Sequence, residues 1–450
     1  MNLIVVVSDT FRYDHCGWNG NHWIHTPDLD RFAAEAVAFD HHYLSSFPTI
    51  PARTDWFSGR FSFPSHGWRP LDPQVPVLAG LLGRTGYLRQ LIIDNPHMMK
   101  GTNHFDRGFD GACWLRGQEG DTYLTRHNHL RPVMPSGKTR QKPRPQGYSL
   151  VDIHRATNFD WAWEEDRFAA RTLRTASRWL EENYKAEQFF LWVDCFDVHE
   201  PWDPPEYWVE RYDPSYAGAP MLHPNYGPAD VYTEAELANL RAHYAGEVSM
   251  ISRWFGRLLH KLEDIGLDER TAVVFTSDHG MFLGEHNRTG KSNIWPGDER
   301  RWPLYEEVAH TPLFIRVPGL RPRRVSALVQ PPDLMPTLLE LAGTGTPTAV
   351  HGRSLLPVLR GEVATHRAVA ISGAHRGAGP EVAVRDGRFS YYPDGETGTP
   401  ELYDTANDPG ETRNLAPLEQ GEVRRLEDAW RSWTAEHGAQ AAAGPGGVDW

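Results

Sequence analysis

Apolar runs that predict strands alternate with helix-like segments along most of this chain. The strands are predicted at Leu3–Val7, Leu91–Ile93, Phe189–Val193 and Ala272–Thr276. Residues 28–39 and a longer stretch opened by the capping box Thr233-x-x-Glu236 have helical apolar spacing. This alternation is typical of a mainly parallel sheet with helices on both faces, so we predict an α/β fold.

Acidic residues follow three of the predicted strands. Asp9, Asp194 and Asp278 each come just after an apolar run, and His279 follows Asp278 directly. Because sites in open α/β sheets form beyond the carboxyl ends of the strands, we expect these residues to share one site. Oxygen donors with one imidazole suit a divalent ion, with Mn²⁺, Ca²⁺, Mg²⁺ and Zn²⁺ as the candidates.

The composition changes near residues 343–348. Short predicted strands at Ala368–Ser372, Glu381–Val384 and Arg388–Tyr392 precede a helix at about Leu418–Glu436. We therefore predict a catalytic α/β domain over 1–345 and a small antiparallel subdomain with one helix over 346–450. Its last ten residues are expected to form a flexible tail, and residues 131–149 a long surface loop.

Net charge and cysteine content restrict the partners. The chain of 450 residues carries a formal net charge of −13 and has three widely spaced cysteines. An acidic chain without a basic block is a poor ligand for nucleic acid or an anionic membrane. We expect a cytoplasmic protein that acts on a small anionic molecule. The oligomeric state is left open, a homo-oligomer included.

The segment Thr49-Ile50-Pro51-Ala52-Arg53 with Ser58-Gly59-Arg60 resembles the signature C-x-P-S-R…T-G-R of one family, the sulfatase branch of the alkaline phosphatase superfamily. The other matching segments are Thr26–Arg31, Asp197–Trp202, Gly284–His286 with Gly290-Lys291, Pro336–Leu339 with Leu341–Gly343, and Glu401–Asp404 with Asp408-Pro409 and Asn414–Ala416. The resemblance implies an alkaline-phosphatase-like fold.

The departures from the family pattern concern the chemistry. Thr49 stands where sulfatases carry the cysteine that matures to formylglycine, and a threonine cannot form that aldehyde. Ala52 replaces a serine of the maturation motif, and Thr10 replaces a metal-binding aspartate. His279 resembles the phosphonate monoester and phosphodiester hydrolases of the superfamily more than typical arylsulfatases. The stretch Arg116–Asp121 resembles a poorly characterised branch without a known substrate.

The resemblance also implies a role for each matching residue. One divalent ion would be held by Asp9, Thr49, Asp278 and His279, without formylglycine. Arg53 would brace the nucleophile Thr49. The groups that grip the oxyanion and assist the leaving group would be His66, His199 and Lys291. Candidates for a second, less expected metal are His286, His310, Asp194 and Asp197.

These roles predict a metal-dependent hydrolase with a threonine nucleophile. A formylglycine intermediate collapses by breaking a carbon–oxygen bond, but an ester of Thr49 must be cleaved by water at the central atom. The sequence therefore favours phosphate or phosphonate esters and diesters. Two alternatives stay open: a sulfate ester hydrolase without formylglycine, and a non-catalytic homologue that only binds an oxyanion.

Overall fold

The centre of the protein is an eight-stranded sheet with the order β12-β2-β11-β8-β1-β6-β4-β5. The computed structural model describes residues 1–121, 124, 126–140, 147–293, 295, 297–376 and 379–437. In sheet order the strands are Arg323–Val329, Val37–His42, Leu313–Arg316, Thr271–Thr276, Asn2–Ser8, Phe189–Cys195, Leu88–Ile93 and Gly111–Trp114. Only β11 runs antiparallel to its neighbours. The predicted, mainly parallel sheet is confirmed.

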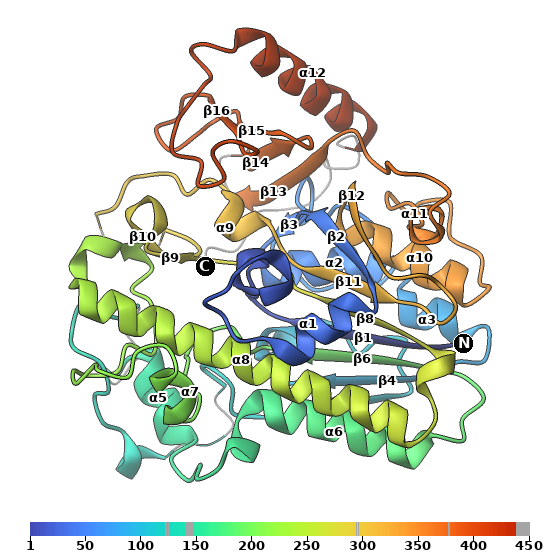
Figure 1. The fold of residues 1–450 in the computed structure, drawn as a ribbon, viewed down its shortest axis with the longest axis horizontal. Helices are drawn as coiled ribbons and strands as arrows, with labels where there is room; N and C mark the ends of the chain where they lie inside the picture. Colours follow the sequence, from blue (N-terminus) through green and yellow to red (C-terminus); the bar gives the residue numbers. More distant parts are fainter. Residues whose placement is uncertain are drawn as a thin grey trace.

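Helices cover both faces of this sheet (Figure 1). One face packs against α1, α6 and α8, which span Pro27–Ala34, Phe168–Asn183 and Glu234–Asp264. The other packs against α2, α3, α10 and α11, which span Thr49–Ser58, Leu78–Gly83, Leu334–Leu341 and Leu356–Arg360. All seven residues of β1 are buried because both faces are covered, which explains its unbroken apolar run.

A second sheet gathers the C-terminal strands. Its order is β16-β15-β14-β13-β3, with strands Glu401–Asp404, Phe389–Tyr392, Gly379–Arg385, Ala370–Arg376 and Ser46–Phe47. Helix α12, Gln420–His437, packs on it, as Figure 1 shows in red. The small antiparallel subdomain is confirmed, but its outer strand β3 comes from the N-terminal region. This strand ends two residues before Thr49, so the second sheet helps to fix that residue's position.

Shorter elements complete the fold. They are α4 Pro96–Met99, α5 Leu150–Thr157, α7 Glu206–Glu210 and α9 Glu306–Ala309, with a three-stranded sheet of β7 Gly227–Pro228, β10 Arg288–Gly290 and β9 Phe282–Leu283. None of the helices in the described part of the chain has the length and apolar character needed to cross a membrane.

One predicted element is wrong in part. The helix expected over residues 28–39 ends at Ala34, and β2 begins at Val37. Val37, Ala38 and Phe39 continue the apolar pattern, but they are buried in the sheet between β12 and β11. The capping box at Thr233 and Glu236 is present, and Gly266 with φ +66° follows the end of α8. The expected flexible tail lies outside the described residues.

Candidate active site

Asp9, Asp278 and His279 converge at the carboxyl ends of the adjacent strands β1 and β8. One ligand atom from each lies within 4.8 Å of the others, and all three side chains are fully buried. Thr10 closes the group from the β1 side: its N–H donates to Asp278 Oδ1 at 3.0 Å and its hydroxyl to Asp9 Oδ1 at 2.7 Å. Thr10 adopts φ +63°, which costs energy in a residue other than glycine and is typical of functional sites.

The donor atoms of this group suit a divalent cation. His279 Nδ1 lies 3.0 Å from the carbonyl of Gly280, so Nδ1 carries the proton and the Nε2 lone pair is left for a metal. Burial lowers the pKa of His279 to about 3, which keeps the ring neutral. Among the described residues, His279 Nε2 is buried without a hydrogen-bond partner, and Asp9 Oδ2 has only an ion pair with Arg53. Buried ligand atoms with unused lone pairs are what a metal site requires.

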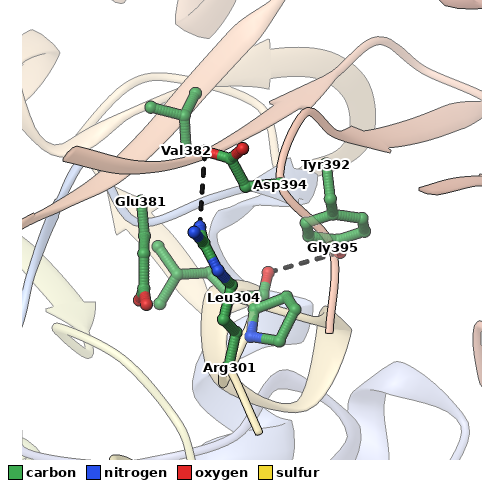
Figure 2. A pocket seen from close by; sticks show the side chains of 8 residues that line it. Arg301, Leu304, Glu381, Val382, Tyr392, Asp394 and Gly395 are labelled. Carbon is green, nitrogen blue, oxygen red and sulfur yellow. Dashed lines mark hydrogen bonds and ion pairs between the residues drawn. The ribbon is translucent and has the colours of Figure 1, made fainter. Parts of the chain in front are cut away.

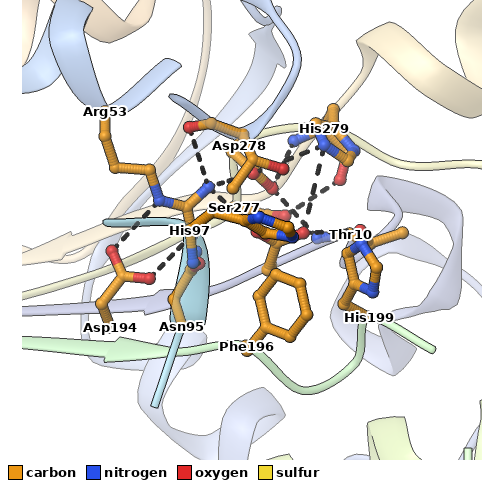
Figure 3. A network of polar contacts seen from close by, with 12 residues as sticks. Thr10, Arg53, Asn95, His97, Asp194, Phe196, His199, Ser277, Asp278 and His279 are labelled. Atoms are coloured by element: carbon orange, nitrogen blue, oxygen red, sulfur yellow. Dashed lines mark hydrogen bonds and ion pairs between the residues drawn. The ribbon is translucent and has the colours of Figure 1, made fainter. Parts of the chain in front are cut away.

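Arg53 lies between three carboxylates. Its Nε and Nη2 donate to Asp194 at 3.2 and 2.8 Å, and Nη1 donates to Asp278 and lies 3.0 Å from Asp9 Oδ2. Figure 3 shows the guanidinium reaching Asp194 on one side and Asp278 on the other. The described cations beside the three carboxylates are Arg53 and Lys291, so the group keeps an excess of negative charge that favours a divalent cation. The expected shared site of Asp9, Asp194 and Asp278 is therefore present.

Thr49 is the first residue of α2 and is 2% exposed. Arg53 follows one helical turn later, and its Nη1 lies 3.4 Å from the Thr49 carbonyl oxygen. The same Nη1 therefore connects Thr49 with Asp9 and Asp278. Pro51 stands in the first turn, where its missing N–H costs nothing. The free N–H groups at the start of α2 carry a partial positive charge that favours an anion beside Thr49.

Two of the three predicted oxyanion-binding residues lie around this group. Lys291 is 8% exposed and its Nζ donates to Thr10 Oγ1 at 3.2 Å. His199 is 4% exposed, stacks on Phe196 at a centroid distance of 3.9 Å, and its Nδ1 lies 2.7 Å from the Glu200 carbonyl. Burial lowers the pKa of His199 to about 3. His199 is therefore neutral, with Nε2 as a hydrogen-bond acceptor.

His66 is placed differently. Its Nε2 lies 3.0 Å from the Pro70 carbonyl in the loop after α2, and its contacts in the described part of the chain do not include the metal-ligand group. The structure instead adds His97, the second residue of α4, whose ring contacts the Phe196 ring on which His199 stacks (Figure 3). No strand-end or spacing signal distinguishes His97 in the sequence, because a His-Met-Met turn is ordinary.

Glu200 is a second functional candidate that sequence reasoning missed. It is fully buried and accepts a hydrogen bond from the Tyr226 hydroxyl. Burial opposes its ionisation, but His199, Lys291 and His223 lower the pKa of Glu200 to about 2. The Glu200 carbonyl binds His199 Nδ1, and the Glu200 carboxylate oxygen Oε2 lies 3.4 Å from the same nitrogen, so Glu200 fixes the orientation of the His199 ring. Its position inside the Asp197–Trp202 motif was the available signal.

The residues predicted to bind a second metal pair with other side chains or lie apart from one another. Both oxygens of Asp194 bind Arg53, and Trp192 Nε1 also donates to Oδ2 at 3.2 Å. Asp197 accepts from Gln118 and the Ala169 N–H, and His310 pairs with Glu306 at 2.9 Å. In the described ranges only Asp9, Asp278 and His279 form a group of three ligands.

A shallow cleft lies elsewhere, between residues 301–304 and the C-terminal sheet. Figure 2 shows Arg301 directed toward Asp394, with the Tyr392 hydroxyl 3.3 Å from the Leu304 carbonyl. No predicted site residue lines this cleft, and its wall is largely apolar, so it is not the catalytic pocket.

Family models match nearly the whole chain. The sulfatase model matches residues 1–344, and the model of the C-terminal region of N-sulphoglucosamine sulphohydrolase matches 298–428. Because the first match covers well over half of the chain, this protein belongs to the sulfatase family. It is accordingly a hydrolase of the family's ester-cleaving class.

Individual relatives agree with this assignment. The arylsulfatase of Clostridium perfringens is 25% identical over an alignment of 467 positions, which covers 94% of this chain and 92% of the relative. The phosphonate monoester hydrolase of Agrobacterium radiobacter superposes with a TM-score of 0.76 at 22% identity, covering 97% and 96% of the two chains. A structure in complex with its substrate D-glucosamine-2-N,6-O-disulfate has a TM-score of 0.73 at 20% identity, covering 97% and 98%. The alkaline-phosphatase-like fold is confirmed.

Proposed function

We propose that this hydrolase cleaves phosphate or phosphonate esters, diesters included, with the Thr49 hydroxyl as nucleophile and one divalent ion. The observation that carries the proposal is the position of Arg53 Nη1, which joins the first turn of α2 to the carboxylates of Asp9 and Asp278. This contact supports a place for Thr49 beside the candidate metal centre of Asp9, Asp278 and His279.

The residues around this centre would have different roles in the transfer of the phosphoryl group from the ester to Thr49. Asp9, Asp278, His279 and the Thr49 oxygen would hold the ion, which would supply Lewis-acid stabilisation and favour the ionised hydroxyl. Arg53 and the start of α2 would orient Thr49 and stabilise negative charge. Lys291 would contact the ester's oxyanion from the Thr10 side.

The second half of the reaction explains the preference for phosphorus. The Oγ1 of Thr49 would attack phosphorus and break its bond to the alcohol oxygen, the hydroxyl proton would leave with the alcohol, and a phosphoryl or phosphonyl ester of Thr49 would remain. Water would then attack phosphorus and break the phosphorus–Oγ1 bond, which returns the proton to Thr49. His199 Nε2, an acceptor in this tautomer, is suited to take the proton of that water. The likeness of fold to a phosphonate monoester hydrolase supports this choice.

Sulfate ester hydrolysis is the second candidate. It is favoured by the match to the N-sulphoglucosamine sulphohydrolase C-terminal model and by the arylsulfatase relative. The same residues would act on it, with sulfur as the central atom. Both candidates need the Thr49 hydroxyl, so the choice of ester and the nucleophile are tested separately.

We expect Thr49→Ala to lower turnover by roughly 10³-fold or more, as loss of a nucleophile usually does. Protein loaded with Mn²⁺, Ca²⁺, Mg²⁺ or Zn²⁺ would be assayed on 4-nitrophenyl phosphate, methylphosphonate, methyl phosphate diester and sulfate. Thr49→Ser is the matched control and should retain measurable turnover. Rapid acid quench and mass spectrometry should find a phosphorylated Thr49 peptide. Near-wild-type rates in Thr49→Ala would show that water attacks the ester directly.

A further inference from the structure

The loop 116–121 holds the Glu119 carboxylate beside the active site, and the backbone of Glu119 is strained. Asp121 is 1% exposed and binds Arg116 through Nε and Nη2 at 2.6 and 2.8 Å and the Gly117 N–H at 3.0 Å. Gly117 takes φ +112°, where a Cβ would lie 3.0 Å from Asn158 Oδ1. Glu119 then adopts φ +48°, a conformation that a glutamate takes only when its surroundings impose it.

Glu119 faces cations and histidines of the catalytic pocket. It is 6% exposed, and its Oε2 lies 3.0 Å from His97 Nε2. Burial opposes ionisation, but His97, His199 and Arg140 hold the pKa of Glu119 well below its usual range. His97 and His199 contact the same Phe196 ring at centroid distances of 5.6 and 3.9 Å. Glu119 is therefore one layer of side chains away from the predicted leaving-group residue His199.

Arg140 reaches the same place from the loop expected to be a surface feature. Lys138 anchors that loop: its Nζ lies 2.9 Å from Glu236 at the start of α8, and its carbonyl accepts from the Tyr232 hydroxyl at 2.7 Å. The Arg140 guanidinium lies over the Tyr226 ring at 5.0 Å, and its Nε is buried without a hydrogen-bond partner among the described residues. Stacking, more than hydrogen bonding, holds this cation in place.

Glu119 and Arg140 face each other as a loose ion pair without a direct hydrogen bond. Arg140 Nη1 lies 4.0 Å from Glu119 Oε1, beyond hydrogen-bond distance. A hydroxyl oxygen with bonds of about 2.8 Å to both would bridge them at an angle near a right angle, donating to Glu119 and accepting from Arg140. A second anionic group would be repelled by Glu119, and a cation by Arg140. A neutral hydroxyl satisfies both partners.

We propose that Glu119 and Arg140 form a leaving-group subsite that selects esters whose alcohol carries a free hydroxyl near the scissile bond. This inference rests on the proposed function, since it places the alcohol beside His199. It assigns a specificity-determining role to a loop motif and an arginine outside the metal-ligand group. Esters of polyhydroxy alcohols are the substrate class that this pair recognises.

Binding to Mn²⁺-loaded Thr49→Ala protein tests the subsite without turnover. Calorimetry would compare glycerol 3-phosphate with propyl phosphate, which differ by two hydroxyls. We expect glycerol 3-phosphate to bind about tenfold more tightly, because two charge-assisted hydrogen bonds are gained. The ratio should fall below about threefold after adding Glu119→Gln or Arg140→Met. The matched control, Glu181→Gln on the surface of α6, should leave the ratio unchanged.

Equal affinities for the two phosphates, or a ratio unaltered in both subsite variants, would overturn the proposal. If either variant unfolds, the ratio of the two affinities in the parent Thr49→Ala protein still decides the proposal. The proposal is also overturned if neither phosphate binds. Hydrolysis of the 4-nitrophenyl esters tests the proposed function independently. Turnover of those esters with a ratio near one would refute the subsite and leave the hydrolase mechanism standing.

Discussion

The two halves of the catalytic pocket are built in different ways. Asp9, Asp278 and His279 follow β1 and β8, whose register is fixed by pairing within a fully buried sheet. Glu119 and Arg140 lie on loops, each held by one polar clamp at Asp121 or Lys138. The difference separates chemistry from selectivity: the sheet positions the reacting groups, and loops that can vary without disturbing the core contact the rest of the substrate.

This comparison predicts that changes in the strand-end half have the larger effects. We expect Asp9→Asn to abolish the stabilisation of the protein by Mn²⁺. A ligand at 100 times its dissociation constant contributes about 2.7 kcal/mol, so the metal-dependent rise of Tm should disappear. The metal-free protein should keep its Tm or gain slightly, because the variant removes repulsion between Asp9 and Asp278. Differential scanning fluorimetry with EDTA or Mn²⁺ measures both effects.

The matched control for this change lies at the opposite end of the sheet. Asp110 precedes β5 and binds Arg89 at the surface. Asp110→Asn therefore removes a paired carboxylate far from the carboxyl ends of the strands. It should leave the metal-dependent rise of Tm intact. An undiminished Mn²⁺ response in Asp9→Asn would remove Asp9 from the metal centre and with it the basis of the strand-end half.

Asp194 acts on the strand-end half through Arg53 and should show an intermediate effect. It fixes Arg53 through two hydrogen bonds, so Asp194→Asn should let Nη1 move away from Thr49 and Asp278. We expect kcat to fall roughly 10–100-fold with little change in KM, since Arg53 orients the nucleophile. Steady-state kinetics on the best ester checks this split.

Trp192→Phe gives a graded comparison for Asp194. It removes the indole N–H that donates to Asp194 Oδ2 together with part of a fully buried ring, so it should cost roughly 2–3 kcal/mol of stability with a smaller loss of kcat. An Asp194→Asn enzyme with unchanged kcat would show that Arg53 does not depend on this carboxylate for its orientation.

The strand-end half was predictable from the sequence because its signals are local. An unbroken apolar run predicts a strand buried on both faces, and a carboxylate after it predicts a site, as Asp9 and Asp278 show. The error at residues 28–39 has the same origin: apolar spacing continues from α1 into β2, and only pairing with β11 and β12 decides where the helix ends.

The loop-built half could not be predicted in the same way. Glu119 is separated by about twenty residues from both His97 and Arg140, and no periodicity connects them. Their meeting depends on Gly117, on the Asp121 clamp and on the anchoring of Lys138 at α8. Similarly, Ser46-Phe47 gives no sign that it joins the C-terminal sheet as β3. These contacts are set by tertiary packing, which a single sequence does not display.

The smallest effect is expected when the loop clamp itself is loosened. Asp121→Asn removes the charge that binds Arg116 and weakens the bond to the Gly117 N–H, so Glu119 should leave its strained conformation in part of the molecules. Metal binding should be unchanged, and the loss of stability should stay near 1 kcal/mol because Arg116 is partly exposed. The preference for glycerol 3-phosphate over propyl phosphate should fall a few-fold. Asp110→Asn, which breaks a similar arginine pair at the sheet's edge, should preserve that preference. If Asp121→Asn instead lowers the Mn²⁺ response as much as Asp9→Asn does, the two halves are not independent, and the separation of chemistry from selectivity fails.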